Sequence, residues 1–123
     1  MHTQNEIVTI GYGGKRPEAF FKELDTIDPD LLVDVRAFPY RAFLNVYTKN
    51  YLEKKYKNEY VWIEELGNPS RSLPPVLLNE EVGLGRLHDL MEDNFRIVLL
   101  CAEKDEEHCH RGYVKAKLLS ENR

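Results

Sequence analysis

Short apolar runs alternate with amphipathic stretches along this chain. Residues 6–10, 31–35, 59–63 and 96–102 are rich in branched and aromatic side chains, which predicts strands. Residues 17–27 place Phe20, Leu24 and Ile27 at the spacing of an amphipathic helix, and Pro17 suits its first turn. The pattern therefore begins as strand, helix, strand.

The sequence predicts three further helices. Residues 51–57 are predicted to form a short polar helix, and the spacing of Leu84, Leu87 and Leu90 predicts another. Residues 109–120 are predicted to form the last helix, with Val114 and Leu118 facing inward. The segment 67–75 carries glycine and three prolines and is predicted to be a loop.

Strands that alternate with helices predict a parallel sheet. The runs 31–35 and 96–102 are apolar almost throughout, as expected of strands that are covered on both faces. We therefore expect a small three-layer α/β/α fold with a mainly parallel sheet of about four strands and a Rossmann-like or rhodanese-like topology. A length of 123 residues fits one domain over residues 1–123.

Composition narrows the class of protein. Charged residues make up 31% of the chain, no apolar run reaches the roughly 18 residues of a membrane span, and the first residues do not resemble a signal peptide. These features predict a cytoplasmic protein without a membrane partner. The net charge of −4 gives no general attraction to nucleic acid, which leaves only a local basic patch for such a partner. The two cysteines are expected to be free thiols or ligands rather than a disulfide.

Polar residues gather where the predicted strands end. Ligands of open α/β sheets bind beyond the carboxyl ends of the strands, so these turns should meet at one edge. The residues that they carry there are Tyr12, Gly13, Asp34, Arg36, Tyr40, Arg41, Cys101, Glu103, Cys109, His110 and Arg111.

The first two turns suggest anion binding and leave structural alternatives open. The "GYGG" at 11–14 could cradle a phosphate or simply form a turn that needs positive φ. Arg36 or Arg41 could clamp a carboxylate or phosphate with two parallel hydrogen bonds. Asp34 and Arg36 lie on one face of a strand, however, and could instead form an ion pair with each other.

The last turn carries the groups most suited to chemistry. Glu103 should point toward the edge, where it could accept a proton or a hydrogen bond. A thiolate at Cys109 would be favoured by the helix dipole and by Arg111. Cys101 is a buried packing residue, a nucleophile with a lowered pKa, or part of a zinc site with Cys109 and a histidine, His108 or His110.

Four segments carry a resemblance to a known family. "TIGYGG", "VDVRAFPYR", "YVWIEELGN" and "LLCAEKDEEHCHRGYVKAKLL" together resemble the family catalogued as domain of unknown function 488, in order and over nearly the whole chain. The sequence departs from it in the "KDEEH" spacer, where the family often has a proline, and at Tyr40-Arg41, where it often has Ser-Arg. The resemblance implies a fold and a site but no established reaction.

The sequence thus predicts a protein that binds an anionic, nucleotide-like small molecule. Arg36, Arg41 and the glycine turn would hold the anion, Tyr12 and Asp34 would orient polar groups, and Cys101, His110 and Arg111 would complete the site. Whether it is an enzyme stays open; if it is, we expect transfer or hydrolysis through Glu103 or Cys109. The alternatives are a thiol or zinc module and a non-catalytic interaction domain. No cofactor or oligomeric state is assigned.

Overall fold

The fold is built on a sheet of parallel strands. The computed structural model describes residues 5–42, 44–70, 74–102 and 110–121, with the last two side chains of the final range left out. The strands are β1 (Glu6–Gly11), β2 (Leu31–Asp34), β3 (Tyr60–Trp62) and β4 (Arg96–Cys101). They pair in the order β1-β4-β2-β3, and each pair is parallel. This confirms the predicted parallel sheet.

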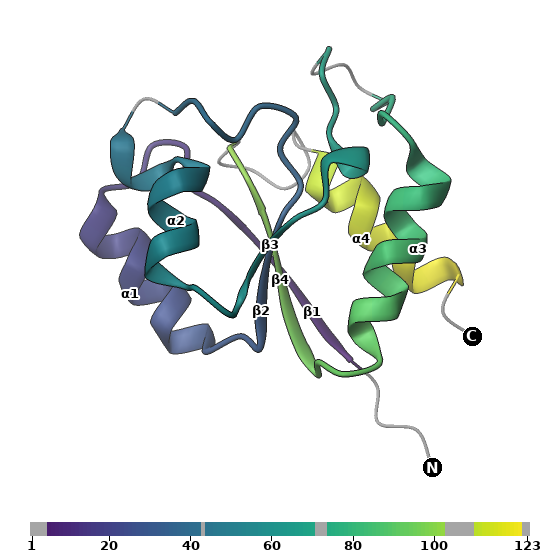
Figure 1. Cartoon of the computed structure of the whole chain (residues 1–123), viewed down its shortest axis with the longest axis horizontal. Coiled ribbons are helices and arrows are strands. Elements are labelled where there is room, and N and C mark those ends of the chain that lie inside the picture. Colours follow the sequence, from purple (N-terminus) through teal and green to yellow (C-terminus); the bar gives the residue numbers. More distant parts are fainter. Residues whose placement is uncertain (1–4, 43, 71–73, 103–109, 122–123) are drawn as a thin grey trace.

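Helices cover both faces of the sheet. They are α1 (Pro17–Ile27), α2 (Lys49–Lys55), α3 (Glu80–Met91) and α4 (His110–Glu121), with short 3-10 helices η1 (Asn45–Tyr47) and η2 (Glu64–Leu66). Figure 1, which views the sheet edge-on, shows α1 and α2 at one side and α3 and α4 at the other. The predicted three-layer α/β fold is therefore present. No helix in the described ranges is long and apolar enough to cross a membrane.

Local signals explain where the helices begin and end. Pro17 starts α1, and Asp28 ends it in the left-handed conformation at φ 52°, so this helix has its predicted bounds. The Thr48 hydroxyl accepts from the Tyr51 backbone N–H and starts α2 two residues earlier than predicted. The Asn79 side chain caps α3 in the same way through Val82.

The two faces of the central strands build two separate cores. Along β4, Ile97 and Leu99 pack under α3 and α4, whereas Val98 and Leu100 pack under α1 and α2. All four side chains are fully buried, as the unbroken apolar run predicts. The same alternation decides which face of the sheet each residue beyond the strand ends will join.

Candidate functional site

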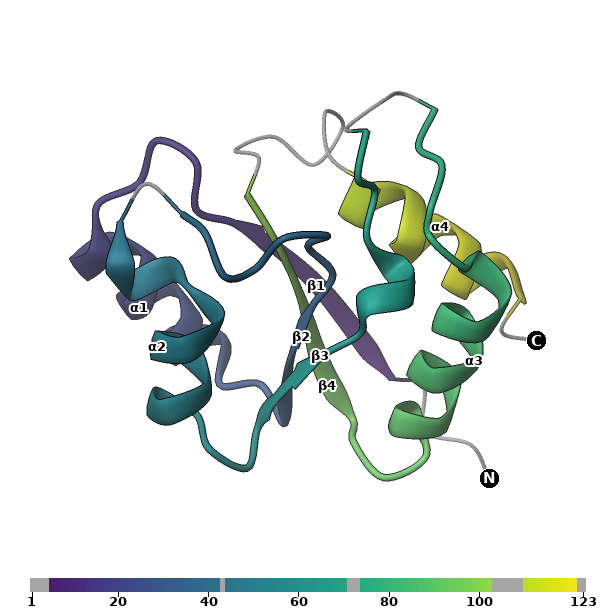
Figure 2. The ribbon, with the colours of Figure 1, turned by 45° about the horizontal axis from the view of Figure 1, so that its top comes forward.

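The carboxyl ends of the strands meet at one edge, as predicted, but the sheet divides the candidate residues between its two faces. The register aligns Gly11 with Cys101 and Asp34 with Leu100. Tyr12 belongs to the core under α1 and α2, whereas Cys101 belongs to the core under α3 and α4. Figure 2 brings this edge toward the viewer, with the two pairs of helices on either side. The candidate residues therefore form two groups.

A buried ion pair is the centre of the first group. Arg36 donates through Nε to Asp34 Oδ1 at 2.8 Å and through Nη2 to Asp34 Oδ2 at 2.6 Å. The backbone N–H of Arg36 also donates to Oδ1, at 3.1 Å. Asp34 is fully buried and Arg36 is 5% exposed. The structural alternative for these residues, an ion pair within the chain, is thus realised.

Three tyrosines complete the network around this pair. Arg36 Nη1 donates to the Tyr47 carbonyl at 2.6 Å and to the Tyr12 hydroxyl at 3.3 Å, and the Tyr60 hydroxyl donates to Asp34 Oδ2. Tyr60 was not among the predicted site residues; its pairing with Leu32 puts it on the same face as Asp34. Tyr47 was missed, because it enters through its backbone from a 3-10 helix that no periodicity signals.

Burial and charge act together on the ionisation of this network. Burial alone would lower the pKa of Arg36, but the hydrogen bonds and charge of Asp34 outweigh it and raise that pKa. Burial and the Asp34 charge also raise the pKa of Tyr60 well above its usual value. A ligand anion that reached Arg36 would compete with Asp34 for the same donors, so anion binding by Arg36 stays a prediction.

The glycine turn after β1 has a structural task of its own. Gly13 donates its N–H to the Ala102 carbonyl at 2.8 Å, and Lys15 donates to the Tyr12 carbonyl at 3.0 Å. Gly14 has φ 72°, a conformation that favours glycine. The backbone conformation of the turn therefore explains the need for glycine whether or not a ligand binds. The phosphate-binding role of Gly13 remains an expectation.

The second group of candidate residues lies on the face of α3 and α4, and one prediction about it is wrong. Cys101 is disulfide-bonded, so the prediction of a free thiol at this position is wrong. His110 begins α4, with Nδ1 3.6 Å from Cys101 Sγ and Nε2 2.5 Å from the Val35 carbonyl. The thiol prediction rested on the assumption of a reducing compartment, which the residues themselves do not encode.

The remaining candidates of the last turn are placed only in part. Arg111 is buried in the first turn of α4, and Glu103, His108 and Cys109 lie outside the described residues. Within the described ranges, no three His, Cys, Asp or Glu side chains are grouped as metal ligands. A disulfide sulfur is not the thiolate that zinc prefers, so Cys101 in this state does not fit the proposed zinc site.

An aromatic surface lies where the loop after β2 meets β3. Phe38 and Tyr40 are 66% and 58% exposed, and Tyr40 stands edge-on to Trp62 with ring centres 5.5 Å apart. Trp62 is held by a 2.8 Å hydrogen bond from its indole Nε1 to the Arg36 carbonyl. We call Tyr40 and Trp62 the aromatic surface. It is fixed to the ion pair through the Arg36 backbone.

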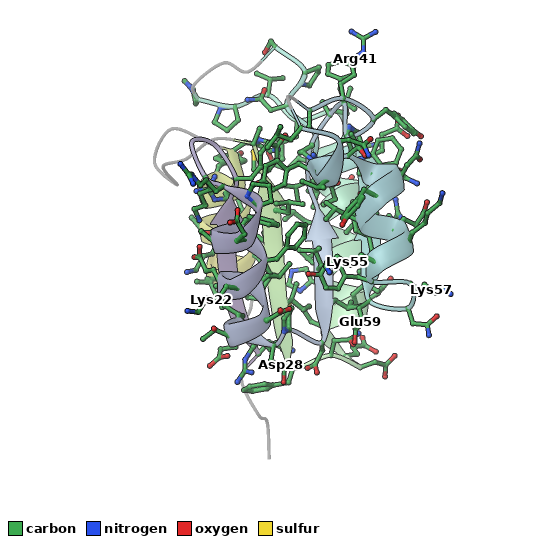
Figure 3. The ribbon with its side chains drawn as sticks, turned by 90° about the vertical axis from the view of Figure 1, so that its left-hand side faces the viewer. Lys22, Asp28, Arg41, Lys55, Lys57 and Glu59 are labelled. Carbon is green, nitrogen blue, oxygen red and sulfur yellow. The ribbon has the colours of Figure 1, made fainter. Side chains whose placement is uncertain are left out.

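Two cations accompany the aromatic surface. Lys49 Nζ lies 5.8 Å from the centre of the Tyr40 ring and about 6.0 Å from that of Trp62. Its backbone N–H donates to the Pro39 carbonyl at 2.7 Å, which ties α2 to the loop. Arg41 is exposed, and Figure 3 shows it extending outward at the carboxyl-terminal edge of the sheet. This edge therefore combines flat apolar rings with positive charge.

Comparison with known proteins gives a family and no individual relative. The family model described as domain of unknown function DUF488 matches residues 16–77 and 75–118. The search of curated proteins and the search of solved structures each found no match. Since the family model covers the ion pair, the aromatic surface and most of α4, the resemblance noted in the sequence is confirmed. The chain belongs to the DUF488 family of domains of unknown function.

Proposed function

We propose that the chain binds a nucleotide-like anion on the aromatic surface. The observation that carries the proposal is the exposure of Tyr40, an aromatic side chain that is 58% exposed and yet contacts both Trp62 and Lys49. Exposed aromatic rings that stand beside cations are the usual platform for a stacked base and its phosphate. In this proposal the base stacks on Tyr40, and Arg41 and Lys49 neutralise the phosphate.

The buried network would support this surface rather than contact the ligand first. Asp34 fixes Arg36, and the Arg36 carbonyl fixes the indole of Trp62. The loop that carries Tyr40 and Arg41 is tied to Arg36 at one end and, through Pro39, to α2 at the other. Loss of the Asp34–Arg36 pair would therefore loosen the platform as well as the fold.

Charge limits the kind of ligand. Lys49 already pairs with Glu53, at 3.2 Å, so it supplies less than a full positive charge. Arg41 is exposed and can form a two-pronged contact with a phosphate. We expect affinity to need both a base and a phosphate, because neither element alone gives a large interaction free energy.

Titration of tryptophan fluorescence with AMP tests the proposal, because Trp62 is the single tryptophan of the chain. We expect saturable quenching by AMP, weaker quenching by adenosine, and none by inorganic phosphate alone. Arg41→Ala should weaken AMP binding about tenfold, as the loss of a charge-assisted contact predicts. Arg86→Ala on α3 removes the same charge elsewhere and should leave the affinity unchanged. Absence of saturable quenching, or equal losses in both variants, would refute the proposal.

Transfer or hydrolysis by Glu103 or Cys109 would be a further step at the same edge. Both residues lie outside the described part of the chain, so the catalytic role rests on the sequence argument alone. Turnover should therefore be looked for only with a ligand that has first been shown to bind. Loss of turnover with retained binding in Glu103→Gln is the result expected if Glu103 acts on that ligand.

A further inference from the structure

A pocket lies at the opposite, amino-terminal edge of the sheet. It has a volume of about 300 Å³, which lies within the range of small-ligand sites. Its lining residues come from the end of α1, the start of β2 and the connection from α2 to β3: Leu24, Asp25, Asp28, Pro29, Leu32, Tyr56 and Glu59. Figure 3 shows Asp28 and Glu59 at this edge, far from Arg41.

The charges of the lining are all of one sign. Asp25, Asp28 and Glu59 supply three carboxylates, and the other lining residues are apolar or tyrosine. Asp25 and Asp28 lie in the last turn and at the end of α1, the negative end of its dipole, where acidic side chains are unfavourable. A third carboxylate from another element adds repulsion. A bound cation would offset the repulsion among these carboxylates.

A buried polar atom points to the same kind of ligand. The hydroxyl oxygen of Tyr56 is buried and has no hydrogen-bond partner among the described residues, and such groups normally have one. Burial and the charges of Asp25 and Glu59 raise the pKa of Tyr56 to about 12, so this hydroxyl keeps its proton at neutral pH. An N–H donor that reached this oxygen would supply the missing hydrogen bond.

The spacing of the acids favours a larger cation over a metal ion. Among the described residues no three carboxylates or other ligating side chains converge closely enough for one metal. Lys55 Nζ lies 5.7 Å from the centre of the Tyr56 ring, so the ring already attracts one ammonium group. Leu24, Pro29 and Leu32 offer apolar contact for an alkyl chain.

We propose that this pocket binds a small alkyl diamine, with its two ammonium groups paired to separate carboxylates among Asp25, Asp28 and Glu59 and its chain on the apolar residues. The proposal is independent of nucleotide binding at the other edge. It assigns to the protein a second ligand site of opposite charge preference.

Binding of 1,5-diaminopentane, measured by calorimetry and by NMR chemical shifts, tests this proposal. We expect one saturable site and shifts confined to residues 24–32 and 56–60. The neutral isostere 1,5-pentanediol and magnesium chloride should not reproduce the shifts. The Asp25→Asn/Glu59→Gln variant should weaken binding about tenfold or more, as removal of two charged partners predicts.

Matched variants distinguish binding in the pocket from a general attraction of the diamine to the negatively charged protein. Asp89→Asn removes an exposed carboxylate on α3 and should leave diamine affinity unchanged. Asp28→Asn removes another carboxylate of the pocket and should also weaken diamine binding. The variant should keep the fold, because asparagine tolerates the left-handed conformation found there. Tyr56→Phe should weaken binding severalfold without loss of the fold. No saturable binding to the wild type, or an equal loss in Asp89→Asn, would overturn the proposal.

Discussion

At the scale of single residues, Asp34 is a position on which several buried interactions depend. Its two oxygens accept from Arg36 and Tyr60, and it is fully buried. A buried charge that loses its partner retains the desolvation penalty without the compensating attraction. The pair therefore contributes little net stability as a unit, but either half alone is costly.

Replacement of Asp34 should show this asymmetry. We expect Asp34→Asn to lower the free energy of unfolding by about 3 kcal/mol or more, since Arg36 keeps its charge. Urea unfolding followed by circular dichroism measures the change. Glu65→Gln, which breaks the more exposed pair with Arg86, is the control and should cause a far smaller loss. Similar losses in the two variants would contradict the buried-pair interpretation.

Alkaline pH should destabilise the fold through the tyrosines. Burial is the leading cause of the raised pKa of Tyr47, Tyr56 and Tyr60, with Tyr56 at about 12. An unfolded tyrosine ionises near pH 10, so above that pH the unfolded state binds fewer protons than the folded one. The free energy of unfolding therefore has its full value below about pH 10 and decreases as the pH rises toward 12. Unfolding midpoints between pH 9 and about 12 measure this, and Tyr56→Phe should flatten the slope; a slope that Tyr56→Phe leaves unchanged would contradict the assignment.

At the scale of elements, hydrophobic periodicity predicted the regular structure well. The α1 helix has its predicted bounds, and the four strands lie where apolar runs placed them. The errors occur at element boundaries such as the start of α2, where Thr48 supplies a cap that periodicity does not register. The 3-10 helices η1 and η2 were missed for the same reason, since three residues are too few to show a period.

Replacement by alanine should change the stability of the protein in opposite directions at two glycines. A Cβ at Gly67 would lie 2.6 Å from Ala37 Cα, a backbone atom that has no easy way to move, whereas Gly85 has open space around it. We expect Gly67→Ala to destabilise by about 1–3 kcal/mol through overpacking. Gly85→Ala should stabilise by up to about 1 kcal/mol, because it lies within α3. Thermal unfolding of both variants gives the signs, and equal signs would refute the packing argument.

At the scale of the whole molecule, the sheet presents edges of different chemistry. The carboxyl-terminal edge carries the aromatic surface with Arg41 and Lys49, and the amino-terminal edge carries the pocket with three carboxylates. The sequence located the first edge, because strand ends can be read from apolar runs. It could not locate the pocket, since Asp25, Asp28 and Glu59 look like ordinary surface acids until the fold brings them together.

The division of the candidate site was also beyond the sequence argument. Tyr12, Asp34 and Cys101 were all correctly placed at the strand ends, yet the face that each side chain joins depends on register. The exposure of Tyr40 was not predictable either, because periodicity does not describe loops. The sequence therefore predicted which edge of the sheet carries the candidate residues, but not which face each side chain joins.

The most direct test of nucleotide binding is an NMR titration of the labelled protein with AMP. The indole N–H of Trp62 gives a single resonance in this chain and donates to the Arg36 carbonyl beneath the aromatic surface. The account predicts saturable shifts of this resonance and of the amides from residue 36 to residue 49, with the amino-terminal edge unaffected. An unmoved indole resonance, or shifts centred on the carboxylate pocket, would contradict it.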